Sequence, residues 1–207
     1  MENQHIDYFQ VGSHIGNTGN DHIFNSIKTN QTIVLIEPVP FLFKSLKENY
    51  SKYEENNKIT YLNIAVSNKD GTLELFIPSE KNDMTQFPDW VTQLSSVNES
   101  HIPMHNIQGL IIDKIAFPCF RLNTLVKNMN ISSINTLYID TEGHDYDILM
   151  DFDLSILKPK TIIFESTHME RPFLQGTKYT HLVEHFKQNG YTIVYENGTD
   201  TCVTLKN

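Results

Sequence analysis

Residues 8–19 read YFQVGSHIGNTG, and residues 32–38 read TIVLIEP. Each stretch opens with apolar residues of strand length; the first continues into a turn with Gly12 and Gly16, and the second ends at Glu37. Glycines lack a side chain, so backbone amides in such a turn can approach a ligand closely. An acid at the end of the next strand lies where open α/β sheets bind a ribose. The two stretches predict a nucleoside-cofactor site; the alternative is a turn that serves tight packing only.

The spacing of the glycines distinguishes between cofactors. A dinucleotide-binding turn has the pattern Gly-x-Gly-x-x-Gly, with a helix N-terminus that faces a pyrophosphate. Here the glycines are Gly12, Gly16 and Gly19, so the middle one comes too late. The carboxylate of Glu37 can accept hydrogen bonds from both ribose hydroxyls of either cofactor. The spacing therefore favours S-adenosylmethionine and argues against a nicotinamide oxidoreductase.

Length and charge limit the function further. With 207 residues, the chain is expected to form a single domain, residues 1–207, with a sizeable core. Its 16 basic and 25 acidic residues give a net charge of -9, the wrong sign for a surface that neutralises phosphates. We therefore expect no nucleic-acid partner and a small or neutral acceptor.

Cysteine use and hydropathy indicate the compartment. Cys119 and Cys202 lie far apart, with no Cys-x-x-Cys pair for zinc or redox chemistry. No apolar run approaches the ~20 residues of a membrane span, so no membrane partner is expected. The segment before the first predicted strand is too short for a signal or transit peptide. These features predict a cytoplasmic protein.

Apolar runs of strand length alternate with segments of helical period, which is typical of an α/β fold with a parallel sheet covered on both faces. The predicted strands are Tyr8–Val11, Thr32–Ile36, Thr60–Ala65, Thr136–Ile139, Lys160–Phe164, Tyr191–Tyr195 and Thr201–Leu205. The last two flank the turn ENGTD and are expected to form a β-hairpin. Helices are predicted where apolar residues recur at spacings of three and four, within residues 40–53, 122–129 and 179–186.

One stretch, residues 78–118, lacks such periodicity. Connections longer than about 12–15 residues without structure of their own are usually lids, binding loops or disorder. Large apolar residues in this stretch favour an ordered cover, namely Trp90, Leu94, Ile102, Leu110 and Ile111. We call residues 78–118 the insertion, and we expect it to form a lid and to contribute to the acceptor site.

Six blocks of the chain, taken in order, resemble one protein family. They read FQVGSHIGNTGND, LIEPVPFLFKSLKENY, NIAVSNKDGTLELF, QLSS, the pair LNTLV and INTLYIDTEGHDYDIL, and IIFESTHM. Over nearly its whole length, the chain resembles the FkbM family of S-adenosylmethionine-dependent methyltransferases. The resemblance implies a class I methyltransferase fold: a Rossmann-like, seven-stranded, mostly parallel sheet with strand order 3-2-1-4-5-7-6 and the last-numbered strand antiparallel.

The resemblance also implies which residues bind the cofactor. The expected set is Gln10, Gly12, Ser13, His14, Gly16, Glu37, Pro38, Ala65 and Val66. Within it, the glycine turn would line the methionine part, Glu37 would hold the ribose, and Ala65 and Val66, at the end of the third strand, would flank the adenine. Two positions depart from the family pattern: Gln10 stands where many members have an acid, and His14 replaces the usual Asn.

Candidate catalytic groups follow two strands of the predicted sheet. Methyl transfer to a hydroxyl requires alignment of the reactants and removal of the hydroxyl proton, by a general base or with the help of a metal ion. Asp140 ends the fourth strand, and Glu165, followed by His168, ends the fifth. At one sheet edge, these three side chains are predicted to supply a base or to bind a divalent ion such as Mg²⁺.

Other roles compete for the polar residues nearby. Acids after a strand often cap the next helix, and Asp145 or Asp147 would favour its positive N-terminus. Glu142 and His144 follow Asp140 closely; we interpret His144 as a capping or surface residue, because a ligating His needs a second shell of partners. For Asp140, the strand end, the neighbouring glycine and the family position favour function over capping.

The leading interpretation is an S-adenosylmethionine-dependent O-methyltransferase that acts on a sugar, a glycan or a small-molecule hydroxyl, because members of the family modify secondary metabolites and glycans. The alternative is a catalytically inactive, methyltransferase-like binding module, which Gln10 and His14 keep open. The first strand begins too early for an N-terminal helix to cover the cofactor. The cover has to come from the insertion or from another subunit, so a homo-oligomer is also open.

Overall fold

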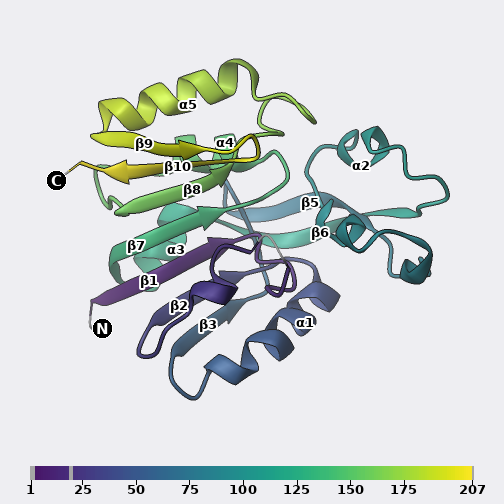
Figure 1. The fold of residues 1–207 in the computed structure, drawn as a ribbon, viewed down its shortest axis with the longest axis horizontal. Coiled ribbons are helices and arrows are strands. Elements are labelled where there is room, and N and C mark those ends of the chain that lie inside the picture. Colours follow the sequence, from purple (N-terminus) through teal and green to yellow (C-terminus); the bar gives the residue numbers. More distant parts are fainter. Residues whose placement is uncertain (1–2, 19–20, 207) are drawn as a thin grey trace.

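A seven-stranded sheet forms the centre of the molecule (Figure 1). The structure is a computed structural model that describes residues 3–18 and 21–206; Gly19 of the glycine pattern lies outside these residues. The strand order is β3-β2-β1-β7-β8-β10-β9, and β10 runs antiparallel to both of its neighbours. Numbered within this sheet alone, the order is 3-2-1-4-5-7-6, so the predicted topology is confirmed.

The strands of this sheet overlap their predicted ranges, although β1 and β7 begin four and five residues earlier than predicted. They are β1 (Gln4–Val11), β2 (Thr32–Ile36), β3 (Lys58–Leu62), β7 (Ile131–Ile139), β8 (Thr161–Glu165), β9 (Tyr191–Glu196) and β10 (Asp200–Leu205). β9 and β10 form the predicted hairpin. The predicted end of the third strand is wrong: β3 stops at Leu62 rather than Ala65. Its partner β2 ends where Ile36 pairs with Leu62, and Pro38 has no N–H with which to extend the ladder.

Helices cover both faces of the sheet, as predicted. They are α1 (Pro40–Tyr50), α3 (Leu122–Asn128), α4 (Asp145–Asp151) and α5 (Gly176–Gln188), with the short turns η1 (Phe24–Ser26) and η2 (Ser51–Tyr53). Leu46 of α1 packs on Ile33 and Leu35 of β2, whereas α3, α4 and α5 pack on the face that contains Val34 and Ile36. Within residues 3–18 and 21–206, no helix is long and apolar enough to cross a membrane.

A second, three-stranded sheet lies beyond the carboxyl ends of β1 and β7 (Figure 1). It has the order β4-β6-β5 and consists of β4 (Ala65–Ser67), β5 (Gly71–Pro78) and β6 (Ile112–Arg121). Two predictions are corrected here. Ala65 and Val66 belong to β4 and not to the third strand, and residues 112–118 of the insertion form a strand paired with β5. This pairing joins segments distant in sequence, so no local periodicity reveals it.

The rest of the insertion, residues 79–111, contains only short helical turns. They are η3 (Met84–Gln86), η4 (Asp89–Gln93) and α2 (His101–Met104). Leu94 and Ile102 are buried, as expected for an ordered segment, whereas Trp90 and Ile111 are exposed. The backbone of Ser96 exchanges two hydrogen bonds with Phe76 of β5, which attaches the middle of the insertion to the small sheet.

Candidate functional site

A cavity of about 850 Å³, counted with its mouth, opens at the carboxyl ends of β1, β2 and β7. Its wall contains every residue of the expected cofactor-binding set except Gly16, together with Asp140 and Glu142. A Cβ atom at Gly16 would lie 2.2 Å from the ring of Tyr50, so this glycine allows the turn to pack on α1. The insertion contributes the other side of the cavity through Thr92, Gln93, Ser95 and Val97.

Gly12 sets the shape of the cavity floor. Its φ is +77°, and a Cβ atom there would lie 1.7 Å from the carbonyl oxygen of Asp140. Only a residue without a side chain therefore lets β1 and β7 approach each other at this point. The N–H groups of Gly12 and Ser13 both donate to the carbonyl oxygen of Ile36, at 3.0 and 2.9 Å, which closes the turn over the end of β2.

Glu37 lies at the end of β2 with 5% of its surface exposed. Its two carboxylate oxygens accept hydrogen bonds from the N–H groups of His14, at 2.9 Å, and Val39, at 2.8 Å. Burial raises the pKa of Glu37 to about 7. Each oxygen keeps a lone pair for a further donor, so this carboxylate can hold a pair of ribose hydroxyls.

Gln10, one of the two positions that depart from the family pattern, pairs with an acid from another segment. The Gln10 amide donates to the carboxylate of Asp21 at 3.2 Å, and both residues line the cavity. Asp21 is held in turn by the N–H groups of Ile23 and Phe24, each at 2.7 Å. The cavity therefore has an acid beside Gln10 that a different segment supplies. Sequence reasoning missed Asp21, although its place at the start of a turn is a signal for an acid that accepts backbone N–H groups.

His14 joins the glycine turn to the insertion. Its Nε2 lies 2.9 Å from the hydroxyl oxygen of Thr92, which itself donates to the carbonyl of Asp89. Because that hydroxyl proton is already used, the His14 ring donates to the oxygen. Burial lowers the pKa of His14 to about 4, so the ring is neutral at pH 7.

Asp140 lies on the cavity wall, as predicted for a catalytic group. The hydroxyl of Tyr138 donates to one of its oxygens at 3.1 Å. Burial raises the pKa of Asp140 to about 8, and the neighbouring Glu142 carboxylate adds to the shift. Asp140 is therefore poised to exchange a proton near neutral pH.

Glu165 and His168 lie behind Asp140, outside the wall of the cavity. Nε2 of His168 lies 3.4 Å from the Glu165 carboxylate, and Nδ1 accepts a hydrogen bond from the N–H of Phe173 at 3.0 Å. Burial raises the pKa of Glu165 well above its usual range and lowers that of His168 to about 4. The two residues form a pair that does not line the cavity and reaches it only through other side chains.

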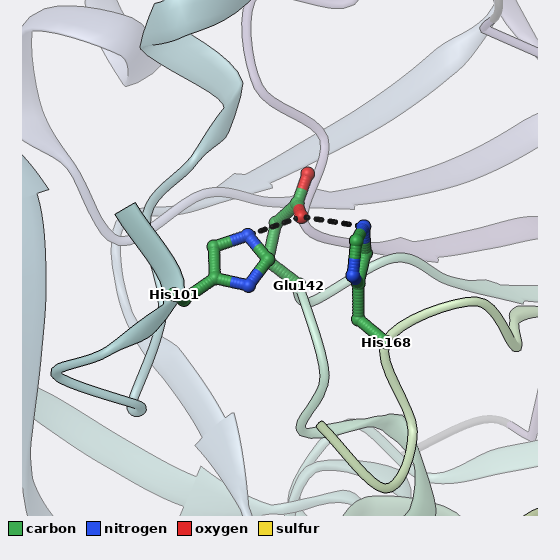
Figure 2. A group of neighbouring side chains, drawn as sticks. All are labelled: His101, Glu142 and His168. Carbon is green, nitrogen blue, oxygen red and sulfur yellow. Dashed lines mark ion pairs between the residues drawn. The ribbon is translucent and has the colours of Figure 1, made fainter. Parts of the chain in front are cut away.

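Glu142 links this pair to the insertion. Figure 2 shows the rings of His101 and His168 on opposite sides of the Glu142 carboxylate, with Nε2 atoms 2.8 and 3.9 Å from the same oxygen. Among the described residues, two groups of side chains bring donor atoms within 4.8 Å of one another: His101, Glu142 and His168, and Asp140, Glu142 and Glu165. The predicted metal set of Asp140, Glu165 and His168 is not such a group: Asp140 and Glu165 come together with Glu142, whereas His168 comes together with Glu142 and His101. Nothing local to His101 signalled this contact across the fold.

The acids after Glu142 lie in the first turn of α4, where they favour its positive N-terminus, although no side chain of the described residues caps this helix by a hydrogen bond. Asp145 opens α4 and accepts hydrogen bonds from the N–H and the hydroxyl of Thr141, and Asp147 lies in the same first turn. His144 precedes the helix, but it is not a surface residue: its Nε2 lies 2.8 Å from the hydroxyl of Ser67, and it lines the cavity.

The sheet order, the glycine turn and the strand-end acids define a class I methyltransferase. Residues 10–193 match the family described as Methyltransferase FkbM domain. The chain therefore belongs to the FkbM family of S-adenosylmethionine-dependent methyltransferases. The comparison with curated proteins finds no match.

Solved structures include a relative from this family. The chain is similar to the methyltransferase FkbM from Methylobacillus flagellatus KT, with 11% identity and a TM-score of 0.56, over 100% of this chain and 45% of that one. Two other likenesses have TM-scores below 0.5. The O-methyltransferase from Bacillus cereus in complex with S-adenosylhomocysteine is 8% identical, with a TM-score of 0.48 and coverage of 97% and 74%. The fibrillarin pre-rRNA processing protein of Methanococcus jannaschii is 11% identical, with a TM-score of 0.46 and coverage of 98% and 67%.

Proposed function

We infer that this chain transfers a methyl group from S-adenosylmethionine to a hydroxyl of a sugar, a glycan or a small molecule. The observation that carries the proposal is one cavity whose wall combines a nucleoside-type site with a buried acid. The glycine turn and Glu37 line this cavity together with the buried carboxylate of Asp140.

The cavity has the features that the cofactor requires. Glu37 has lone pairs for the ribose hydroxyls, and Ala65 and Val66 offer apolar contact for the adenine. Oε1 of Gln10 is buried and has no hydrogen-bond partner among the described residues, so it can accept from the amino group of the methionine part. When bound, the cofactor supplies an electrophilic methyl group.

Asp140 is the group proposed to handle the acceptor proton. Its raised pKa keeps it close to half-protonated near pH 8, where a general base is most effective. The hydroxyl of Tyr138 holds one carboxylate oxygen, which leaves the other free for the acceptor hydroxyl. A divalent ion such as Mg²⁺ at the same wall would acidify that hydroxyl instead, and activity lost to a chelator and restored by Mg²⁺ would identify this second route.

A cluster of aromatic rings outside the cavity lining suits an acceptor with an apolar ring face. Trp90 and Phe173 are 43% and 60% exposed. The ring of His105 lies between them, with centroids 5.6 Å from Trp90 and 5.0 Å from Phe173. Exposed aromatic rings of this kind bind rings with one apolar and one polar side. The insertion, which carries two of the three rings, is proposed to close over the bound reactants.

The test combines binding with transfer. Calorimetry with S-adenosylhomocysteine measures cofactor binding, and labelled S-adenosylmethionine is then incubated with free sugars, glycans and phenols. We expect binding together with a methyl ether product from at least one acceptor. Binding without transfer to any acceptor would favour the inactive binding module, and a product methylated on nitrogen or carbon would refute O-methylation.

A further inference from the structure

Three carboxylates lie against one another beside the cavity. Donor atoms of Asp140, Glu142 and Glu165 are all within 4.8 Å of one another. No Lys or Arg of the described residues forms an ion pair with any of them. One oxygen of Glu165 is buried and has no hydrogen-bond partner in the described part of the chain. A divalent cation among the three carboxylates would balance their charge and would give this oxygen of Glu165 a partner.

The hydrogen bonds of His168 decide which donor group can hold a metal ion. The N–H of Phe173 donates to Nδ1 of His168, so the proton of the neutral ring is on Nε2. That Nε2–H faces carboxylate oxygens of Glu165 and Glu142, at 3.4 and 3.9 Å. A ligating His has the opposite arrangement, in which the second nitrogen donates and the first offers its lone pair. His168 is therefore a poor ligand and a good positioning residue for the carboxylates.

His101 provides an independent sign of a missing ligand. Its side chain is 1% exposed, and its Nε2 lies 2.8 Å from Glu142, yet no hydrogen bond of suitable direction reaches this nitrogen from the described residues. The ring packs edge-on against His168, with centroids 4.8 Å apart. Buried polar atoms without a partner are rare in native structures. The His101 imidazole on α2 thus lies against the Glu142 carboxylate without a well-directed hydrogen bond.

We propose that Asp140, Glu142 and Glu165 together bind one hard divalent cation, Mg²⁺ or Mn²⁺, with His168 as a positioning residue for Glu165. Carboxylate oxygens are the donors that these ions prefer, whereas a set with two imidazoles would suit zinc or another later metal. The cation deepens the proposed function, since Asp140 would act on the acceptor through it. Binding of the cation, however, is measured without methyl donor or acceptor. The cation site can therefore be confirmed or refuted independently of methyl transfer.

The experiment is a titration with Mn²⁺, whose free ion is counted by its electron paramagnetic resonance signal. We expect one Mn²⁺ per wild-type chain, displaced by Mg²⁺. Glu142→Gln and Glu165→Gln keep shape and remove one ligand charge, so each should weaken Mn²⁺ binding by more than about 100-fold, since even outer partners of a ligand are worth 10- to 100-fold. His168→Ala should lose about 10- to 100-fold, and His168→Gln, which keeps an N–H donor, should recover part of that loss.

Asp200→Asn is the matched control. Asp200 lies close enough to Asp140 to raise its pKa, but it pairs with His22 and is not one of the three carboxylates. Its loss should change Mn²⁺ affinity by less than about threefold, as expected for a distant charge. An equal loss of Mn²⁺ affinity in Asp200→Asn and Glu142→Gln would mean that the ion responds only to the general negative potential of this region. That result would overturn the proposed site. So would the absence of Mn²⁺ binding, or binding that depends on His101 and His168 but not on Asp140 and Glu165.

Glu142→Gln and Glu165→Gln keep the size and polarity of the side chains, so these variants are expected to fold. Thermal unfolding shows whether each variant is folded and whether Mn²⁺ stabilises it. At Mn²⁺ concentrations 100 times the Kd, the wild-type melting temperature should rise by about 5–10 °C. Glu142→Gln should melt no lower than wild type without Mn²⁺ and should gain little from it. A variant that responds to Mn²⁺ as the wild type does would contradict the proposal.

Discussion

At the scale of single residues, the close packing at Gly12 predicts how its substitution changes stability. A Cβ atom there would meet the carbonyl of Asp140 at 1.7 Å, in a backbone conformation with φ +77°. Gly12→Ala should lower the free energy of unfolding by more than about 3 kcal/mol, because strain and a backbone clash add. Gly109→Ala is the control: its φ is +78°, but no atom lies within 4 Å of the added Cβ. It should lose only about 1–2 kcal/mol. Equal losses in urea unfolding would refute the role of the close approach.

Glu37 makes a prediction about the cofactor. Glu37→Ala removes the carboxylate proposed to accept from the ribose, and hydrogen bonds to a charged group are worth about 1.5–3 kcal/mol. Calorimetry should therefore show S-adenosylhomocysteine binding weakened by roughly 10- to 150-fold. The exposed Glu54, which accepts from Tyr61 far from the cavity lining, is the control, and Glu54→Ala should bind normally. Unchanged affinity in Glu37→Ala would refute the ribose position.

Asp140 makes a prediction about chemistry. Asp140→Asn keeps the shape of the side chain and removes its charge, so turnover should fall by about 10²–10⁴-fold, the usual contribution of a general base. Affinity for S-adenosylhomocysteine should change little. If Asp140→Asn instead unfolds the protein without a specific kinetic defect, its role is structural, and the base has to be sought elsewhere on the cavity wall.

At the scale of elements, the contact between His14 and Thr92 connects the cofactor turn to η4 of the insertion. Thr92→Val keeps the volume and leaves the His14 N–H buried without an acceptor, at a cost of about 1–3 kcal/mol. Amide hydrogen exchange in residues 89–105 should therefore become about 5- to 100-fold faster, while the central sheet keeps its protection. Thr85→Val, on the exposed turn η3, is the control. Unchanged exchange in Thr92→Val would mean that other contacts hold the insertion.

The elements that sequence predicted correctly are those with a local signal. The strands of the main sheet and the hairpin at residues 191–205 follow from apolar runs between turn residues. The small sheet was missed because β5 and β6 pair across the whole of residues 79–111, and Pro118 within β6 weakens the strand pattern.

The residues of the candidate site also fall into those that a local sequence signal predicts and those that it does not. Glu37 and Asp140 follow strands directly, so strand order alone brings them to one edge. His101 reaches Glu142 only because the insertion folds back over the edge. Glu142 turns toward it from a backbone with φ +51°, a conformation that no sequence period encodes. Asp21 likewise reaches the cavity wall beside Gln10 through a side-chain hydrogen bond that no sequence pattern predicted.

At the scale of the whole molecule, buried acids make stability depend on pH. Burial raises the pKa of Glu37 to about 7 and those of Asp140 and Glu142 to about 8. In the unfolded chain these groups titrate near their ordinary values of about 4. Between these pH values the folded chain holds more protons than the unfolded chain. Their contribution to stability is therefore complete at low pH and is lost as pH rises through 7 and 8.

Buried histidines change stability with pH in the opposite direction, and they do so over a lower pH range. The pKa of His14, His101 and His168 is lowered by burial to about 4, against 6.5 in the unfolded chain. Their contribution is complete above pH 6.5 and is lost as pH falls toward 4. Above pH 6.5 these histidines are neutral in both the folded and the unfolded chain. Among these groups, only the carboxylates then still bind different numbers of protons in the two states.

We therefore expect the free energy of unfolding to fall between pH 6.5 and 8.5, measured by urea unfolding with a chelator present. The expected decrease is about 3–5 kcal/mol, since two groups with a pKa of about 8 and one of about 7 lose their protons over this range, each at up to about 1.4 kcal/mol per pH unit. Glu142→Gln removes one of the titrating groups and should flatten the dependence, whereas substitution of the exposed Glu54 should leave it unchanged. A stability that stays constant or rises over this range would mean that the acids beside the cavity are ionised in the metal-free protein. The protein would then need other groups to balance their charge.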